Sequence, residues 1–137
     1  MLSTEARTKV AKVLPAALEQ FSGTDQYHRL SPLHGRLVVT DGVKYLCDQA
    51  GAYWLVDVIA SHQRRALRDP MLQDIQFWTI RVDEEKRTAL VTCARDEDDV
   101  VIRQRIPWTD FPLAEQRIWV ERGGPNDTWV AMLPGER

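Results

Sequence analysis

The hydrophobic and polar positions of residues 40–63 form the most ordered pattern in the chain. The first half of this segment places apolar side chains three, four and seven positions apart, as one helix face does, at Val43, Leu46, Cys47 and Ala50. Asp41 precedes this face and can serve as its N-cap, and Gly51 follows it and can end the helix in a left-handed conformation. The spacing therefore predicts a short helix before Gly51.

Residues 52–60 form a second, nearly continuous apolar segment that only Asp57 interrupts. A helix of this composition needs other parts of the protein on most of its sides, so we expect it at the centre of the core. An alternative interpretation makes Asp41 and Gly42 a hairpin turn between residues 37–39 and 43–46, because Asp-Gly favours such turns. The pattern favours the helix and leaves the hairpin open.

The segment before this pair, residues 4–21, has apolar positions at three- and four-residue intervals, which is typical of an amphipathic helix. Pro15 lies inside it, and a proline in a helix interior removes one hydrogen bond and clashes one turn back. We therefore expect this helix to kink or to restart at Pro15. Residues 25–35 contain proline and glycine and are predicted to form a loop, and residues 37–39 form a short strand or lead into the helices.

Beyond residue 70 the apolar positions alternate with a period of two, which indicates half-buried strands. In the first of them Trp78, Ile80 and Val82 share one face. Strands are predicted at residues 76–82, 88–94, 100–106, 117–121 and 128–133. We therefore predict one α+β domain over residues 1–137, with N-terminal helices (about 4–68) packed on one face of a four- to five-stranded antiparallel meander sheet (about 75–133).

Composition narrows the cellular setting. The 137 residues suffice for one domain with a sizeable core. A net charge of -2 gives no overall electrostatic attraction to nucleic acid or to an anionic membrane. Two widely separated cysteines without a secretory leader suggest reduced, buried thiols, and the longest apolar segment is too short to span a bilayer. We expect a cytoplasmic protein that has no membrane partner.

The residues that could carry chemistry show no known catalytic or metal-binding spacing. The soft metal ligands are His28, His34, His62, Cys47 and Cys93, and none of them forms a paired spacing such as CxxC or HExxH. The sequence also contains no phosphate-binding loop and no nucleophile elbow. We therefore predict no catalytic residue, no cofactor and no metal.

A ligand-binding site is one alternative. The predicted loop contains Tyr27, His28 and Arg29, which are side chains that recognise polar ligands, and loops on a rigid scaffold often carry function. Asp57 lies in an apolar segment, where a carboxylate is costly to bury without a partner. We expect Asp57 to pair with this loop, either as a structural bond or within a small enzyme or ligand site.

The polar face of the predicted sheet carries a stripe of arginines. Arg81, Arg103 and Arg105 project from it, because the last two are two residues apart on one strand. Such a stripe could contact phosphate in a DNA-binding accessory protein. The acidic turns at residues 83–85 and 96–99 would repel a polyanion, so nucleic acid is not the favoured partner.

Exposed tryptophans next to acidic residues favour a protein partner instead. Trp119 alternates with two apolar neighbours and should face outward, where tryptophan is typical of interface hot spots. Trp108 lies in an aromatic loop near the sheet end. We predict a partner-binding surface from Trp119, Trp108, Asp96, Glu97, Asp98 and Asp99.

Several segments together resemble a known family. They are FSGTDQYHR, LVVTDGVKYLCDQAGAYWLVDVIASHQ, the strand that contains FW, and WTDFPL. They resemble a family of small uncharacterised proteins, a domain of unknown function, encoded on bacterial plasmids, phages and other mobile elements. The resemblance implies a bacterial or phage-infected cytoplasm and supplies no catalytic residues. It suggests a non-enzymatic protein-binding accessory protein, such as an anti-CRISPR-like inhibitor of a bacterial defence system, and a homodimer is compatible with it.

Overall fold

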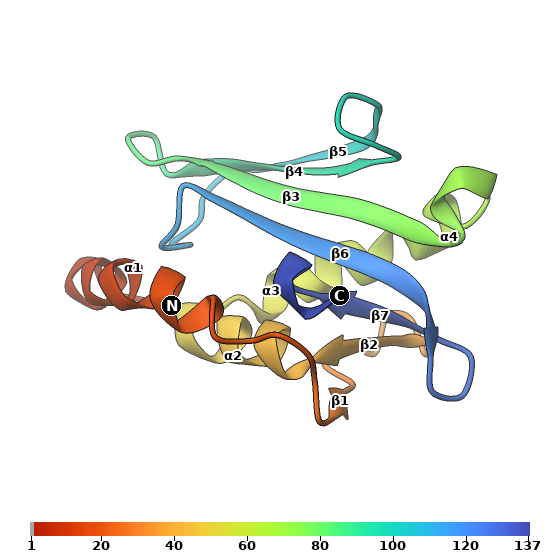
Figure 1. Ribbon diagram of the computed structural model, residues 1–137. Helices are drawn as coiled ribbons and strands as arrows, with labels where there is room; N and C mark the ends of the chain where they lie inside the picture. Colours follow the sequence, from red (N-terminus) through yellow and green to blue (C-terminus); the bar gives the residue numbers. More distant parts are fainter. Residues whose placement is uncertain (1) are drawn as a thin grey trace.

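The computed structural model describes residues 2–137 and has an α+β fold (Figure 1). Its helices are α1 (Thr4–Leu18), α2 (Asp41–Ala50), α3 (Tyr53–Ser61) and α4 (Gln63–Ala66), with 3-10 turns η1 (Pro70–Leu72) and η2 (Pro134–Glu136). Its strands are β1 (Tyr27–His28), β2 (Leu37–Thr40), β3 (Ile75–Asp83), β4 (Thr88–Ala94), β5 (Val100–Ile106), β6 (Glu115–Gly124) and β7 (Thr128–Met132). The predicted α+β class is confirmed.

The sheet is larger than predicted and is not wholly antiparallel. Its seven strands are ordered β1-β2-β7-β6-β3-β4-β5, and β2 pairs with β7 in parallel. The predicted meander is therefore wrong after β5, because β6 returns to pair with β3 instead of continuing beside β5. The predicted loop before residue 37 also contains β1, which pairs with β2. Figure 1 shows β3, β4 and β5 at one end of this sheet and β1 at the other.

The helix before Gly51 is confirmed, and the alternative hairpin is wrong. Gly51 ends α2 with φ of 62°, the left-handed conformation that glycine adopts without steric cost. The N-cap is Thr40 rather than Asp41: its backbone is extended and its hydroxyl accepts a hydrogen bond from the Val43 amide at 3.3 Å. Asp41 is instead the first helical residue, where the positive end of the helix dipole stabilises its negative charge.

The first helix tolerates its proline without restarting. α1 runs continuously through Pro15, which is exposed, and ends at Leu18, three residues before the predicted end. The hydroxyl of Ser3 caps it by accepting a hydrogen bond from the Ala6 amide at 3.1 Å. Since Pro15 lies in the last turn, the one backbone bond that it removes is close to the helix end.

One face of the sheet belongs to the main core. Buried residues of α1, α2 and α3 form a single cluster with buried strand residues that include Trp78, Ile80, Val91, Ile102 and Ile118. Both cysteines lie in this cluster, and burial raises the pKa of each thiol to about 12. The cysteines are therefore apolar packing residues rather than thiolate nucleophiles.

A closed network of amide groups lies inside the same core. Gln63 on α4 and Gln76 on β3 exchange two side-chain hydrogen bonds of 2.9 Å, and Trp78 Nε1 donates to Gln76 Oε1 at 2.9 Å. The remaining amide protons are donated to the carbonyls of Ile59 and Leu72, each at 3.1 Å. Every polar group of the pair is thus satisfied, which a buried polar network requires for stability.

Candidate functional site

The face of the sheet opposite the core carries Trp119 and the three predicted arginines in three rows of side chains that cross the strands, and we call it the open face. The cross-strand register gives an aromatic row, a threonine row and an arginine row. The aromatic row is Met132, Trp119, Phe77, Ala94 and Val100; the threonine row is Arg117, Thr79, Thr92 and Arg103; the arginine row is Glu115, Arg81, Leu90 and Arg105. Small side chains therefore lie in the middle of the face, with large ones along its sides.

This distribution of side-chain sizes makes a hollow over the aromatic and threonine rows. The hollow has a volume of about 580 Å³ and is lined by Phe77, Thr79, Arg81, Thr92, Ala94, Asp96, Glu97, Val100, Arg117 and Trp119. Thr92 and Ala94 form part of its floor and are buried beneath their larger neighbours. The hollow thus combines a floor of small side chains with positive and negative side chains at its rim.

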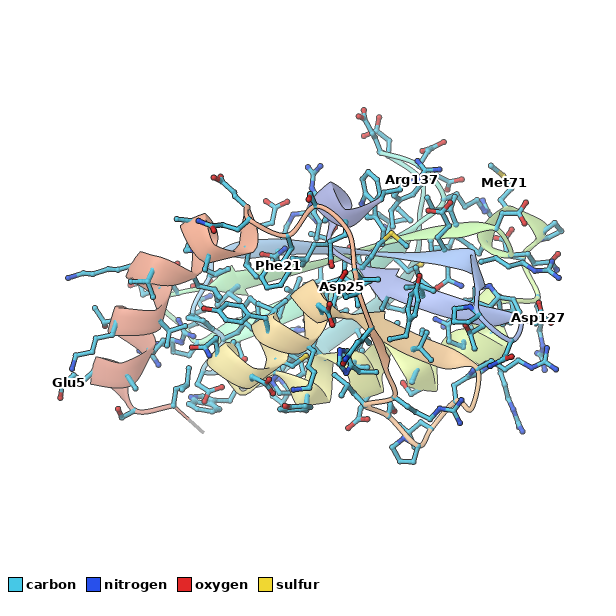
Figure 2. All side chains as sticks on the ribbon, turned by 60° about the horizontal axis from the view of Figure 1, so that its bottom comes forward. Glu5, Phe21, Asp25, Met71, Asp127 and Arg137 are labelled. Carbon is cyan, nitrogen blue, oxygen red and sulfur yellow. The ribbon has the colours of Figure 1, made fainter. Side chains whose placement is uncertain are left out.

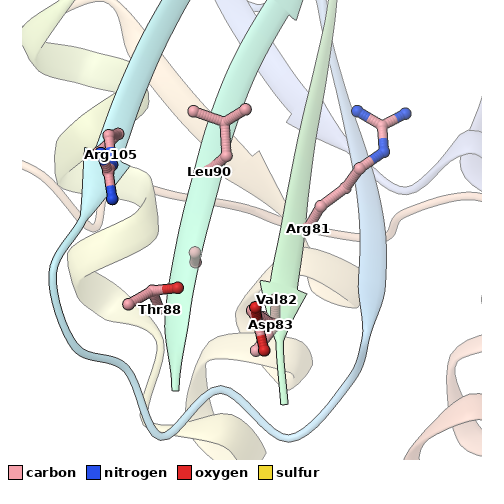
Figure 3. Close-up of a pocket in the computed structure, with 7 residues that line it drawn as sticks. Arg81, Val82, Asp83, Thr88, Leu90 and Arg105 are labelled. Carbon is pink, nitrogen blue, oxygen red and sulfur yellow. The ribbon is translucent and has the colours of Figure 1, made fainter. Parts of the chain in front are cut away.

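A second hollow of about 440 Å³ lies over the arginine row (Figure 3). Leu90 stands between Arg81 and Arg105, and the carboxylate of Asp83 lies at the lower end of the same hollow (Figure 3). The two hollows share Arg81 as a lining residue. The open face is therefore indented along most of β3 and β4.

Trp119 is held in place by its neighbours. It lies on the opposite side of β6 from buried Ile118 and Val120, as its alternation predicts, and it is half-buried. Its ring meets Phe77 edge-on, with centroids 5.2 Å apart, and the guanidinium of Arg137 lies 5.9 Å from its centroid. These contacts orient the indole as a fixed wall of the hollow.

The arginines of the open face differ in their partners. Arg81 and Arg117 each lie 3.7 Å from the same Glu115 carboxylate. Arg103 and Arg105 on β5 are exposed and make no ion pair within residues 2–137. The structure therefore brings together the predicted trio of Arg81, Arg103 and Arg105. It also adds Arg117, which the alternation from Trp119 could have identified.

The acidic turn contributes two of its four carboxylates to this site. Asp96 and Glu97 line the large hollow, and Asp96 also accepts hydrogen bonds from the amides of Asp98 and Asp99, each at 3.2 Å. Asp99 accepts instead a 2.8 Å hydrogen bond from Arg95, whose guanidinium also binds Asp69. This guanidinium holds the pKa of Asp69 below its usual value. Asp99 therefore stabilises the turn rather than the rim of the hollow.

Trp108 lies apart from the other partner-binding candidates. It is 49% exposed and follows the end of β5, whereas Trp119 shares a row with the first residue of β5. A seven-residue strand spans roughly 20 Å, so the two tryptophans lie at different ends of the face. A partner would need to cover the whole length of β5 to contact both of them.

The loop candidates converge on Asp41 and not on Asp57. His28 Nε2 donates to Asp41 Oδ1 at 2.8 Å, and the Asp25 amide donates to the other carboxylate oxygen at 3.0 Å. The hydrogen bond from His28, with smaller contributions from the loop, lowers the pKa of Asp41. The predicted pairing of Asp57 with this loop is wrong, because Asp57 is half-buried on α3 without a hydrogen bond or ion pair in residues 2–137.

The reason lies in the path of the chain. The loop that holds Asp25 crosses the start of α2 (Figure 2). Asp41 is the carboxylate at the start of α2, and it therefore accepts the hydrogen bonds from the loop. Tyr27 is exposed and lines a separate hollow of about 260 Å³ beside the β6–β7 hairpin, while Arg29 is exposed. These contacts join the loop to α2 and do not gather the four ligand-binding candidates around one cavity.

Residues 2–137 contain no group of three or more histidine, cysteine, aspartate or glutamate side chains placed to hold a metal ion. No helix in the same range has the length and apolar character needed to cross a membrane.

Comparison with known proteins places the chain in a family. The family model that matches it is described as a family of unknown function, DUF6876, and the match covers residues 12–137. No curated protein and no solved structure matches the sequence. Since the match covers nearly the whole chain and includes every residue of the open face, the chain belongs to the DUF6876 family of unknown function.

Proposed function

We propose that this chain is a non-enzymatic protein-binding protein and that the open face is its contact surface. The observation that carries the proposal is the hollow of about 580 Å³, in which the fixed aromatic wall of Trp119 and Phe77 lies beside charged rim residues. Buried aromatic and arginine side chains are the common anchors of protein interfaces. The His28–Asp41 pair, the nearest resemblance to a catalytic pair, instead fastens a loop to α2.

The charges of the open face favour a partner that presents carboxylates beside apolar side chains. Four arginines lie on the face, Arg81, Arg103, Arg105 and Arg117, and Glu115 is shared by two of them. Carboxylates of the partner could pair with the two arginines that have no such neighbour, while an apolar side chain entered the hollow. Complementary charges of this kind increase association rate and specificity.

The same face could be taken for a nucleic-acid surface, and two features argue against it. Arg137 lies over the ring of Trp119, where a stacked base would have to lie. Asp96 and Glu97 line the rim of the hollow and would repel a phosphate backbone that passed along it. A protein segment with localised carboxylates avoids both conflicts.

The resemblance to small proteins of plasmids and phages supports a bacterial cytoplasm as the place where this protein binds its partner. In a bacterial cytoplasm, an accessory protein of a mobile element would meet host or competitor machinery. We propose a bacterial defence complex as the partner to test first, with the chain acting as its inhibitor. This assignment rests on the resemblance and on the protein-binding character proposed for the open face.

The test is affinity capture from a bacterial lysate with matched variants. Thr79→Tyr places a ring in the hollow and keeps a residue that favours strands. Thr8→Tyr makes the same change on the exposed surface of α1 and is the control. We expect the wild type and Thr8→Tyr to retain the same protein from the lysate. After that protein is purified, Thr79→Tyr should bind it at least about tenfold more weakly than the wild type does.

Three outcomes are decisive. Equal retention by Thr79→Tyr and Thr8→Tyr would contradict a role for the hollow. Retention that nuclease treatment abolishes would identify nucleic acid as the ligand and overturn the proposal. A retained defence complex whose activity falls on titration with the wild type, and not with Thr79→Tyr, would support the inhibitor assignment.

A further inference from the structure

The free edge of β5 is the longest unpaired strand edge of the sheet. β5 is last in the strand order and pairs only with β4 within residues 2–137, whereas β1 at the opposite edge has two residues (Figure 1). The β4–β5 register shifts near Ala94, and pairing is regular from Ile102 to Ile106. The backbone groups on the outer side of this regular part are available to a further strand.

The side chains of β5 divide by face along this edge. Arg103 and Arg105 lie on the open face and are exposed. Ile102, Gln104 and Ile106 lie on the core face, where Ile102 is buried and the other two are half-buried. Gln104 Oε1 is already bonded to His62 Nε2 at 2.6 Å. An added strand would therefore meet two cations on one face and apolar side chains at both ends of the other.

A second copy of this chain fits the edge poorly. In an antiparallel pair of two β5 strands centred on Gln104, Arg103 of each copy would lie directly opposite Arg105 of the other. Like charges in directly opposed positions destabilise strand pairs. The edge thus disfavours pairing with itself in the register that aligns residues 102–106 of both copies, and it is complementary in charge to an acidic strand.

We propose that the β5 edge binds an extended acidic segment of the protein partner, which adds to the sheet as an eighth strand. Two carboxylates two residues apart would lie opposite Arg103 and Arg105, with a polar residue between them opposite Gln104. Apolar residues on either side would lie opposite Ile102 and Ile106. Main-chain bonds would supply affinity, and the alternating side chains would supply specificity. This inference rests on the protein-binding function proposed above and defines the chemistry of the bound segment.

The probe is a blocked peptide with the sequence serine-valine-glutamate-threonine-glutamate-valine-serine, titrated at low salt into isotopically labelled protein. We expect amide shifts and slower amide exchange along β5. Replacing both glutamates by glutamine should weaken binding about 2- to 5-fold for each lost charge pair. Equal binding of the glutamine peptide would overturn the acidic preference.

Charge reversal makes this test specific to the two arginines. In the variant Arg103→Glu/Arg105→Glu the preference should invert, so that a peptide with lysine in place of glutamate binds and the acidic peptide does not. The control Arg64→Glu/Arg65→Glu makes the same charge change at two exposed residues of α4 and should keep the acidic preference. An unchanged preference in the β5 variant would contradict the proposal, and inversion in both variants would do so as well.

Backbone methylation separates the edge from the open face. Two versions of the acidic peptide carry N-methyl groups at alternate residues, in the two opposite phases, so that one version cannot donate to β5. We expect that version to lose binding and the other to retain it. If both bind equally, the peptide lies elsewhere and the edge proposal is wrong.

The two proposals can fail separately. If none of the peptides binds while Thr79→Tyr still loses the captured partner, the edge proposal is wrong and the open-face function stands. If the peptides bind as expected while Thr79→Tyr retains the partner, the edge proposal is supported and the role of the hollow is contradicted.

Discussion

The buried amide pair of Gln63 and Gln76 makes a strong prediction about stability. Leucine is close in size to glutamine, so Gln76→Leu removes hydrogen bonds and leaves little new cavity. Trp78 Nε1 then loses its partner, and so does Gln63 Oε1, which accepts only from Gln76. The Leu72 carbonyl loses the bond that Gln76 Nε2 donates to it. All three groups lie in the buried core, where water does not replace the lost bonds.

The cost follows from the number of orphaned groups. An unsatisfied buried donor or acceptor costs about 1–3 kcal/mol, so three of them predict a loss of about 3–9 kcal/mol in the free energy of unfolding. Adding Gln63→Leu removes one orphan, since it deletes Gln63 Oε1 itself. The double variant should therefore be more stable than Gln76→Leu by about 1–3 kcal/mol, although it carries one more substitution.

Urea unfolding monitored by tryptophan fluorescence measures these differences. Gln49→Leu, at an exposed position of α2, is the control and should stay within about 0.5 kcal/mol of the wild type. A Gln76→Leu protein as stable as this control would refute the cost assigned to the orphaned groups. A double variant less stable than Gln76→Leu would refute their coupling.

Three further predictions test other parts of the fold. The pKa of Asp41 is lowered in the folded protein, so its carboxylate stabilises the fold at pH values above its ordinary pKa of 3.8. This stabilisation is lost as the pH falls through the lower pKa of the folded state. Asp41→Asn should therefore flatten the acid limb of a plot of thermal unfolding temperature against pH. Cys47 and Cys93, with pKa values raised to about 12, should not react with dithionitrobenzoate at mildly alkaline pH until guanidinium unfolds the protein. Gly51→Ala should lower the free energy of unfolding in urea by about 1–2 kcal/mol, because φ at this position is 62°. Gly35 has open space around it and no positive φ, so the control Gly35→Ala should cost less than about 0.5 kcal/mol. Equal costs would contradict the conformational argument.

The candidate site shows which of its parts local pattern can predict. Alternation places Trp119 on the opposite side of β6 from Ile118 and Val120, and the same rule sets Arg103 and Arg105 on one face of β5. No local rule shows that these two strands belong to the same indented face. That arrangement depends on β6 pairing with β3, which occurs after a long connection from β5.

The loop pairs with Asp41 and not with the predicted Asp57, and this difference also depends on how distant segments pair. The sequence shows that a carboxylate in an apolar segment is costly to bury without a partner and that His28 can pair with a carboxylate. It does not show which carboxylate the loop passes, because that depends on how β1 pairs with β2 ahead of α2. The N-cap is Thr40 and not the predicted Asp41 for a more local reason. Both side chains can cap a helix, and the backbone conformation selects between them.

Local sequence pattern predicts the α+β class, the helix that ends at Gly51 and the side-chain alternation along the strands. These features follow from spacings of two to four residues and from the conformational freedom of glycine, all of which are local. Tertiary contacts set the strand order, the parallel pairing of β2 with β7, the partner of His28 and the meeting of Trp119, Arg117 and the acidic turn in one hollow. Those depend on contacts between residues far apart in the chain, where many pairings satisfy the same local pattern and packing of the whole core selects one.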